Sequence, residues 1–336
     1  MDLGGLDTPS LQGAPDEQPP KELQLALSGV GWATAVITSA SAASSNKALA
    51  LIQGTKSDDF YVTMGCGATA EAKKLGYTIS VQGPVDFSAP EQIPIVDSVT
   101  ASHPAAVLIA PTDVQALVAP MKSMVKAGIH VVQVDTAVNG GSSIAVSSVT
   151  SNNTLGGQKA AQALAALIGN KGTVVVMNEQ PGVSTTDARV AGFVSEMKSS
   201  YKNVKVLSTQ YVGDSPTKAA QTIDSLLAAN PTLNGVFATN VLVAEGVDTG
   251  LNNAGKKGKV KLVGYDADPE QIHDLKANIV QALIAQEPYV EGVDGVEQAV
   301  NSLTGKTVTK SIQTPLMEIT LKNLAADNKY VYQSHC

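Results

Sequence analysis

The chain has 336 residues, of which 43% are hydrophobic and 16% are charged, and its formal net charge is −7. This length is enough for two domains of ordinary size with a well-buried core in a soluble globular protein. A nucleic-acid partner requires a basic face that neutralises phosphates, so the acidic balance argues against such a partner.

The first 46 residues differ from the rest of the chain. Residues 1–22 are rich in Pro, Gly and acids and have no apolar period, which is typical of disorder. Residues 23–46 carry no charge; they contain an apolar run at 25–37, followed by a small-x-small cleavage pattern at 40–42. We predict a leader with a secretory signal, although Lys21 is the only basic residue before the run. A membrane anchor or a linker are the alternatives.

Seven short apolar runs follow the leader, and each ends at a polar or charged residue. They occupy residues 48–52, 106–110, 131–134, 173–177, 236–238, 261–264 and 282–285. Runs this short, rich in Val and Ile and without alternation, are typical of strands covered on both faces in a parallel sheet. In open α/β sheets ligands bind outside the carboxyl ends of the strands, so the polar endings outline a candidate site.

Helix-like segments alternate with these runs. They occupy residues 61–75, 89–102, 114–127, 155–168, 188–199, 217–229, 244–253, 269–277 and 290–303. Such alternation predicts βαβ units and a mostly parallel sheet. The order repeats in the two halves, because Asp135 ends one strand of the first half and Asp266 ends the matching strand of the second. We therefore expect two similar α/β domains with a ligand cleft between them.

From residue 47 to residue 323 the chain resembles the periplasmic sugar-binding proteins of the ribose-binding, LacI-related class. The matching stretches, in order, are residues 57–61, 127–135, 151–157, 182–193, 236–240, 263–266 and 284–286. The resemblance implies a type I periplasmic binding fold: two doubly wound, Rossmann-like parallel-sheet domains joined by a three-strand hinge. It implies an N-terminal domain of residues 47–151 plus 287–316 and a C-terminal domain of residues 152–286 plus 317–336.

The resemblance also implies a set of ligand-binding residues. These are Asp58, Phe60, Tyr61, Asp135, Thr136, Arg189, Asn240, Asp266 and Gln286. Phe60 and Tyr61 supply aromatic rings against which the C–H faces of a sugar can pack. The alternative for Phe60 is an anchor in the hydrophobic core, whereas the Tyr61 hydroxyl needs a polar partner.

The polar members of this set suit hydroxyl groups. Ionised Asp135 and Asp266 accept charge-assisted hydrogen bonds, although Asp also caps helices well. The planar guanidinium of Arg189 can bridge neighbouring oxygens; otherwise it is a surface arginine. The amides of Asn240 and Gln286 both donate and accept, and Gln286 also lies at a predicted hinge crossing. The strand endings Asp113, Asn178 and Glu179 receive no assigned role.

Three positions depart from the pattern of ribose binders. Asp58 replaces an amide, Thr136 replaces an arginine, and Gly213 stands where an aromatic residue is expected before Asp214. The loss of one cation and one ring, with the gain of an acid, makes a larger and more acidic pocket. We therefore expect a sugar or polyol other than ribose.

Other kinds of site have less support. Residues 65–70 fit G-x-G-x-x-A, but that dinucleotide motif must directly follow a strand, so we expect no cofactor. The hydroxyls at 184–186 have no neighbouring His and no G-x-S-x-G elbow, which argues against a serine hydrolase. The two cysteines, Cys66 and Cys336, and four scattered histidines form no metal pattern. We expect Cys66 to be a small apolar residue of a helix, and no disulfide framework.

We predict a non-enzymatic solute-binding protein, periplasmic or extracellular, that delivers a small carbohydrate to the permease of an ABC importer. The domains close over the ligand by hinge bending. We expect a monomer without a nucleic-acid partner. An effector- or autoinducer-binding sensor with the same fold is the alternative, because fold does not settle function. A DNA-binding regulator is disfavoured, since no basic recognition helix precedes residue 47.

Overall fold

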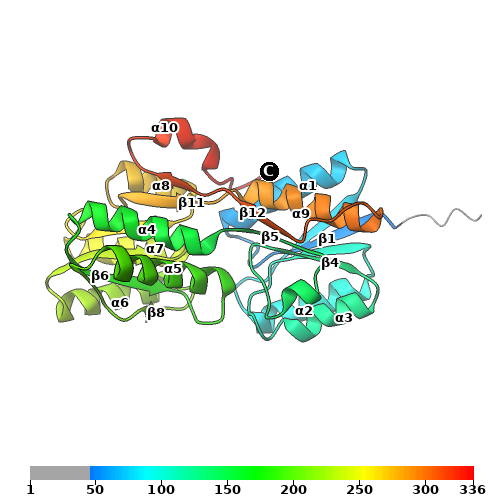
Figure 1. Cartoon of the computed structure of the whole chain (residues 1–336), viewed down its shortest axis with the longest axis horizontal. Helices are drawn as coiled ribbons and strands as arrows, with labels where there is room; N and C mark the ends of the chain where they lie inside the picture. The colour runs from blue at the N-terminus through cyan, green and yellow to red at the C-terminus, as the bar shows by residue number, and fades with distance from the viewer. Residues whose placement is uncertain (1–45) are drawn as a thin grey trace, which may run out of the picture. The chain divides into compact units, whose positions relative to one another are not determined.

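The computed structural model describes residues 46–336, so the predicted disordered leader and secretory signal lie outside the described residues. The described chain forms two parallel-sheet lobes with helices on both faces of each sheet (Figure 1). The α/β fold class predicted from the alternating segments is therefore confirmed. No helix in this part of the chain has the length and apolarity needed to cross a membrane.

The first lobe is built on an all-parallel sheet with strand order β12-β5-β4-β3-β1-β2. Its strands are β1 (Ala48–Ile52), β2 (Thr78–Gln82), β3 (Ala106–Ile109), β4 (His130–Val134), β5 (Ser147–Ser151) and β12 (Ser311–Thr314). Its helices are α1 (Asp59–Lys74), α2 (Ala89–Ala101), α3 (Val118–Lys126) and α9 (Pro288–Leu303), with a short 3-10 turn at Gly141–Ser143. Helices α1 and α9 cover one face, and α2 and α3 cover the other (Figure 1).

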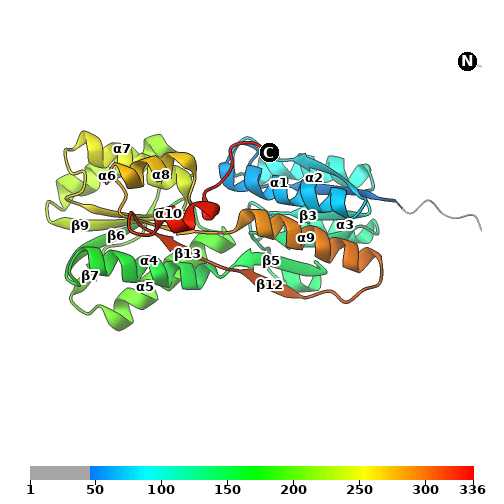
Figure 2. The same ribbon diagram turned by 90° about the horizontal axis from the view of Figure 1, so that it is seen from above.

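The second lobe is built on a sheet with order β13-β11-β10-β9-β6-β7, in which only β13 runs antiparallel. Its strands are β6 (Gly172–Asn178), β7 (Val204–Val206), β8 (Gln210–Tyr211), β9 (Leu233–Ala238), β10 (Lys261–Tyr265), β11 (Ala282–Ala285) and β13 (Met317–Ile319). Its helices are α4 (Asn153–Leu167), α5 (Ser184–Ser200), α6 (Pro216–Ala229), α7 (Val241–Asn253) and α8 (Pro269–Lys276). Figure 2 shows α4 and α5 on one side of this sheet and α6, α7 and α8 on the other.

The chain passes between the two sheets three times. It leaves the first after β5, returns to it after β11, and leaves again between β12 and β13. We propose domain boundaries at residues 151, 286 and 316 because the strands change sheet there. In both lobes the central strands are buried on both faces; Leu51 and Ile52 in β1, for example, have no exposed surface. Covering both faces explains why these strands are continuous apolar runs.

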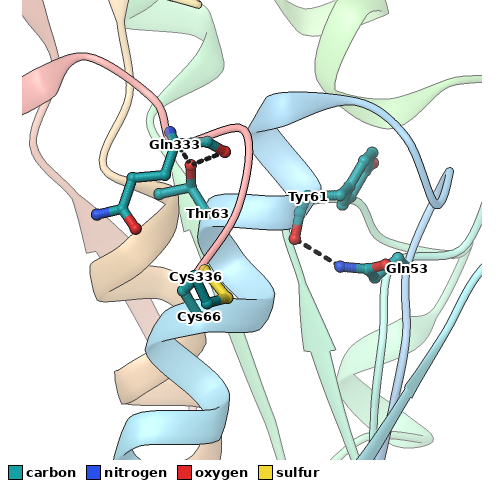
Figure 3. Close-up of a disulfide and its surroundings, with 6 residues drawn as sticks. All are labelled: Gln53, Tyr61, Thr63, Cys66, Gln333 and Cys336. Atoms are coloured by element: carbon teal, nitrogen blue, oxygen red, sulfur yellow. Dashed lines mark hydrogen bonds between the residues drawn. A yellow bond between two sulfur atoms is a disulfide. The ribbon is translucent and has the colours of Figure 1, made fainter.

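The C-terminal tail returns to the first lobe after α10 (Leu324–Asp327) and a 3-10 turn at Asn328–Tyr330. Cys336 forms a disulfide with Cys66 of α1, as Figure 3 shows. Beside it, the Gln333 N–H donates to the Thr63 hydroxyl at 2.7 Å. The expectation that Cys66 is only a small apolar residue is therefore wrong, and the two cysteines, for which no disulfide framework was expected, form one disulfide. The tail, assigned from the sequence to the second domain, is covalently attached to the first lobe.

Candidate functional site

A pocket lies between the lobes, at the carboxyl ends of strands from both sheets. We call it the interlobe pocket; it is lined by Asp58, Phe60, Tyr61, Phe87, Asp135, Glu179, Val183, Thr185, Thr186, Arg189, Asp214, Asn240, Asp266 and Gln286. Eight of the nine residues proposed from the sequence line it. Thr136 does not. Its buried hydroxyl instead donates to the Pro111 carbonyl at 2.8 Å.

Asp135 and Asp266 occupy equivalent places just after β4 and β10. Both have a left-handed backbone, with φ of 58° and 78°. This conformation is uncommon for residues other than glycine, although Asp and Asn adopt it more readily than most. The Tyr61 hydroxyl donates to Asp135 Oδ2 at 2.6 Å. Gln286 Nε2 and the Tyr332 hydroxyl donate to Asp266 Oδ1 at 2.6 and 3.0 Å. The two carboxylates are therefore held in place from both lobes and from the tail.

Burial changes the ionisation of these carboxyl groups. Loss of hydration raises the pKa of Asp135 to about 6, against the opposing effect of the nearby Arg189 charge. Burial likewise raises the pKa of Asp266, and again Arg189 opposes the rise. The pKa of Asp58 is raised well above its ordinary value by burial and by the charge of Asp266. The pocket is thus acidic and poorly hydrated, a setting in which polar contacts with a ligand are strengthened.

Arg189 projects from α5 and is only 3% exposed, so the surface-arginine alternative is wrong. Its Nε donates to Asn153 Oδ1 at 2.8 Å, and its Nη1 donates to the Thr239 carbonyl at 2.8 Å. The guanidinium carbon lies 3.7 Å from the centre of the Tyr265 ring. These contacts fix the plane of the guanidinium before a ligand arrives, which lowers the entropic cost of binding.

Three aromatic rings form one wall of the pocket. The rings of Phe60 and Tyr61 meet edge-on at 5.1 Å, and those of Tyr61 and Phe87 stack at 6.5 Å. Asp58 begins α1 by accepting the Phe60 N–H, and Gln53 holds the Tyr61 carbonyl through its side-chain amide (Figure 3). Phe87 was not anticipated, because it lies in the loop after β2, where the sequence shows no apolar run.

Further lining residues were also missed or left without a role. Glu179 directly follows β6, and its place at the polar end of that strand was the only feature of the sequence that indicated a role in the site. The others, Val183, Thr185, Thr186 and Asp214, come from α5, the loop before it and the loop before α6. Two further strand endings lie outside the lining. Asn178 accepts from the Thr239 hydroxyl, and Asp113 Oδ1 accepts from the backbone N–H of Gln115 and Ala116.

Direct hydrogen bonds join the lobes beside the pocket. The Ala137 N–H donates to the Ser184 hydroxyl at 2.8 Å, and the Val114 N–H donates to the Gly182 carbonyl at 3.0 Å. Ala137 and Val114 belong to the first lobe, whereas Gly182 and Ser184 lead into α5 of the second. The structure therefore has the lobes in contact over the site.

One group of possible metal ligands is present in residues 46–336, away from the pocket. Donor atoms of Glu270, His273 and Asp274 lie within 4.8 Å of one another. Their spacing places them on one face of α8, where Glu270 and His273 are exposed and Asp274 is buried.

Two doubly wound lobes with a polar pocket between their strand ends define a protein that binds a small solute. The sequence matches the family model of the periplasmic binding protein domain over residues 49–307, and the chain therefore belongs to that family. The resemblance noted from the sequence motifs is confirmed.

Relatives and similar structures agree with this assignment. The ribose import binding protein of Salmonella typhimurium is 32% identical over 288 residues, covering 86% of this chain and 94% of the relative. An ABC transporter solute-binding protein from Agrobacterium vitis, solved with α-D-tagatopyranose, has 39% identity and a TM-score of 0.83, covering 85% of this chain and 99% of that one. One from Agrobacterium radiobacter, solved with D-arabinose, has 28% identity and a TM-score of 0.80, covering 85% of this chain and 98% of that one. These relatives are transport-binding proteins rather than enzymes, and none favours the sensor alternative.

Proposed function

We propose that this protein captures a small carbohydrate in the interlobe pocket and delivers it to an ABC importer. The observation that carries the proposal is the pairing of Asp135 and Asp266, one from each lobe, around a pocket that also holds Arg189. Two carboxylates and a guanidinium can receive and donate hydrogen bonds around the edge of a sugar ring. Phe60 and Tyr61 offer apolar surface to its face.

We also propose that the protein binds without catalysing a reaction. Tyr61, Gln286 and Tyr332 direct their polar hydrogens at the pocket carboxylates, which suits orientation of these groups for binding. The family membership and the sugar-bound structures of similar proteins support the same reading. Contacts such as Ala137 to Ser184 would form when the lobes close, and the closed form is what the permease would recognise.

The proposed location is the periplasm or the extracellular space. The disulfide between Cys66 and Cys336 supports this, since disulfides persist in oxidising compartments. We propose a monomer, and the net charge of −7 argues against a nucleic-acid partner. The ligand would be a sugar or polyol other than ribose, because Thr136 is turned away from the pocket and Gly213 supplies no ring.

Thermal-shift measurements with a panel of sugars and polyols test this function. The panel contains D-tagatose, D-allose, D-arabinose, D-fucose, D-ribose, sorbitol and erythritol. A ligand at 100 times its Kd stabilises the native state by about 2.7 kcal/mol, which gives a clear shift. Asp135→Asn should abolish the shift, whereas Asp224→Asn, on the exposed surface of α6, should keep it. A panel with no shift for any member would contradict the binding of a neutral sugar or polyol, and an unchanged shift in Asp135→Asn would contradict the site.

A further inference from the structure

The interlobe pocket has many more acidic than basic groups. Its lining carries five carboxyl groups and one guanidinium: Asp58, Asp135, Glu179, Asp214, Asp266 and Arg189. Within residues 46–336 the ion pair found is Lys74 with Glu71, on α1 and outside the pocket, so no lysine offsets these acids. A neutral sugar adds no charge. The lining is therefore better matched to a ligand that brings a positive charge.

The carboxyl groups of the pocket differ in how many hydrogen-bond donors they receive. Asp135 receives the Tyr61 hydroxyl, and Asp266 receives two donors, from Gln286 and Tyr332. These two carboxylates lie near Arg189, whose charge opposes the rise in their pKa. In this part of the pocket the charge of Arg189 offsets the acids, so the region suits the hydroxyl groups of a ligand.

Glu179 and Asp214 form a contrasting group, which we call the acidic corner. A single amide serves both carboxylates: Asn240 Nδ2 donates to Glu179 Oε2 at 2.6 Å and to Asp214 Oδ1 at 3.0 Å. Glu179 is 4% exposed, and its Oε1 is buried with no hydrogen-bond partner among the described residues. An unpartnered buried carboxylate oxygen is costly unless a ligand supplies a donor.

The ionisation of the acidic corner also favours a ligand with a positive charge. Burial raises the pKa of Glu179 well above its ordinary value, and the charge of Asp214 raises it further. Burial raises the pKa of Asp214 to about 6. A cation placed beside both groups would reverse these rises, because an opposite charge favours the ionised form of a carboxyl group.

We propose that the acidic corner binds a protonated amine, so that the ligand is an amino sugar or an amino polyol. This inference rests on the proposed function and narrows its substrate class. An ammonium group has three donors, so it can reach Glu179 Oε1 and Asp214 together. A hydroxyl group has one donor and brings no positive charge to pair with these two carboxyl groups. The hydroxyls of the same ligand would lie toward Asp135, Asp266 and Arg189.

Matched sugars test the inference by isothermal titration at pH 7. Each set contains a hexose, its 2-amino-2-deoxy form and the N-acetylated amine, in the gluco, galacto and manno series. In at least one series we expect the free amine to bind at least tenfold more tightly than both neutral partners. Glu179→Gln should remove this preference, so that the amine and its neutral partners bind with affinities within about threefold of one another. The control Glu270→Gln, on the exposed face of α8, should keep the preference.

Asp214→Asn provides a second variant should Glu179→Gln fail to fold, and it too should weaken the preference for the amine. Neutral hexoses that bind as tightly as the amines in every series would overturn the inference while leaving the proposed function intact. A preference for the amine that survives both substitutions would also overturn it. Absence of binding by every neutral and amino sugar would refute the proposed function, and the inference with it.

Discussion

Glu291 offers a quantitative test of how the lobes are connected. It lies on α9 with no exposed surface, and its Oε1 accepts hydrogen bonds from the Ser151 and Thr314 hydroxyls, each at 2.9 Å. Ser151 ends β5 and Thr314 ends β12, so Glu291 joins two of the three places where the chain crosses between the sheets. Burial, reinforced by the charge of Asp135, raises the pKa of Glu291 from 4.5 to about 8.

The sign of the pH effect follows from this rise. The folded state holds the Glu291 proton more tightly than the unfolded chain, so the stability that Glu291 contributes is fully present below about pH 4.5. It decreases as the pH rises and is lost above about pH 8. Each tenfold change in proton affinity corresponds to about 1.4 kcal/mol. The rise from 4.5 to about 8 therefore corresponds to as much as about 5 kcal/mol of folding free energy.

Glu291→Gln mimics the neutral acid and removes this titration. Urea unfolding of the wild type and the variant, followed by circular dichroism at pH 5, 7 and 9, measures the difference in unfolding free energy. We expect a difference within about 1 kcal/mol at pH 5 and a variant that is more stable by several kcal/mol at pH 9. The control Glu297→Gln, at a partly buried position of the same helix, should show no such trend. A difference for Glu291→Gln that stays constant from pH 5 to pH 9 would refute the reasoning.

Three further substitutions probe the pocket and the lobes. Gly54→Ala would place a methyl group on the Tyr61 hydroxyl, so sugar affinity measured by titration should decrease about tenfold or more. Normal affinity would contradict the close packing of Gly54 against Tyr61. Cys336→Ser opens a disulfide between residues 270 apart and should lower the unfolding free energy by at most about 5 kcal/mol; an unchanged melting temperature would show that the disulfide does not form. Ser184→Ala removes the acceptor of the Ala137 N–H and should weaken sugar affinity about fivefold, equivalent to about 1 kcal/mol; equal affinity would mean that this contact does not favour closure.

The central strands and the helices could be predicted because their sequence patterns are local. Strands β1, β3, β4, β6, β9, β10 and β11 are apolar because helices cover both faces. The edge and short strands were missed. The sequence of β5, for instance, is Ser-Ser-Val-Thr-Ser, and its neighbour β12 lies 163 residues further along the chain. Helix α3 starts at Val118 rather than at residue 114, because Asp113 caps a turn by accepting the Gln115 and Ala116 N–H.

The pocket could be predicted where a functional residue follows a recognisable strand. Asp135 and Asp266 have this position, and Arg189 was found through its family motif. Thr136 was predicted to line the pocket because it follows Asp135 in the sequence. The backbone at Asp135 is left-handed, and the Thr136 hydroxyl donates to the Pro111 carbonyl instead. The pairing of Cys66 with Cys336 was not predictable, since residues 270 apart are brought together only by the return of the C-terminal tail.

The most direct test of the proposed function is a crystal structure of the protein with the carbohydrate that gives the largest thermal shift. We predict a ring that packs against Phe60 and Tyr61, with hydroxyl groups bonded to Asp135, Asp266 and Arg189. A ligand bound outside the interlobe pocket, or inside it without contact to either aspartate, would contradict the proposed function of the site.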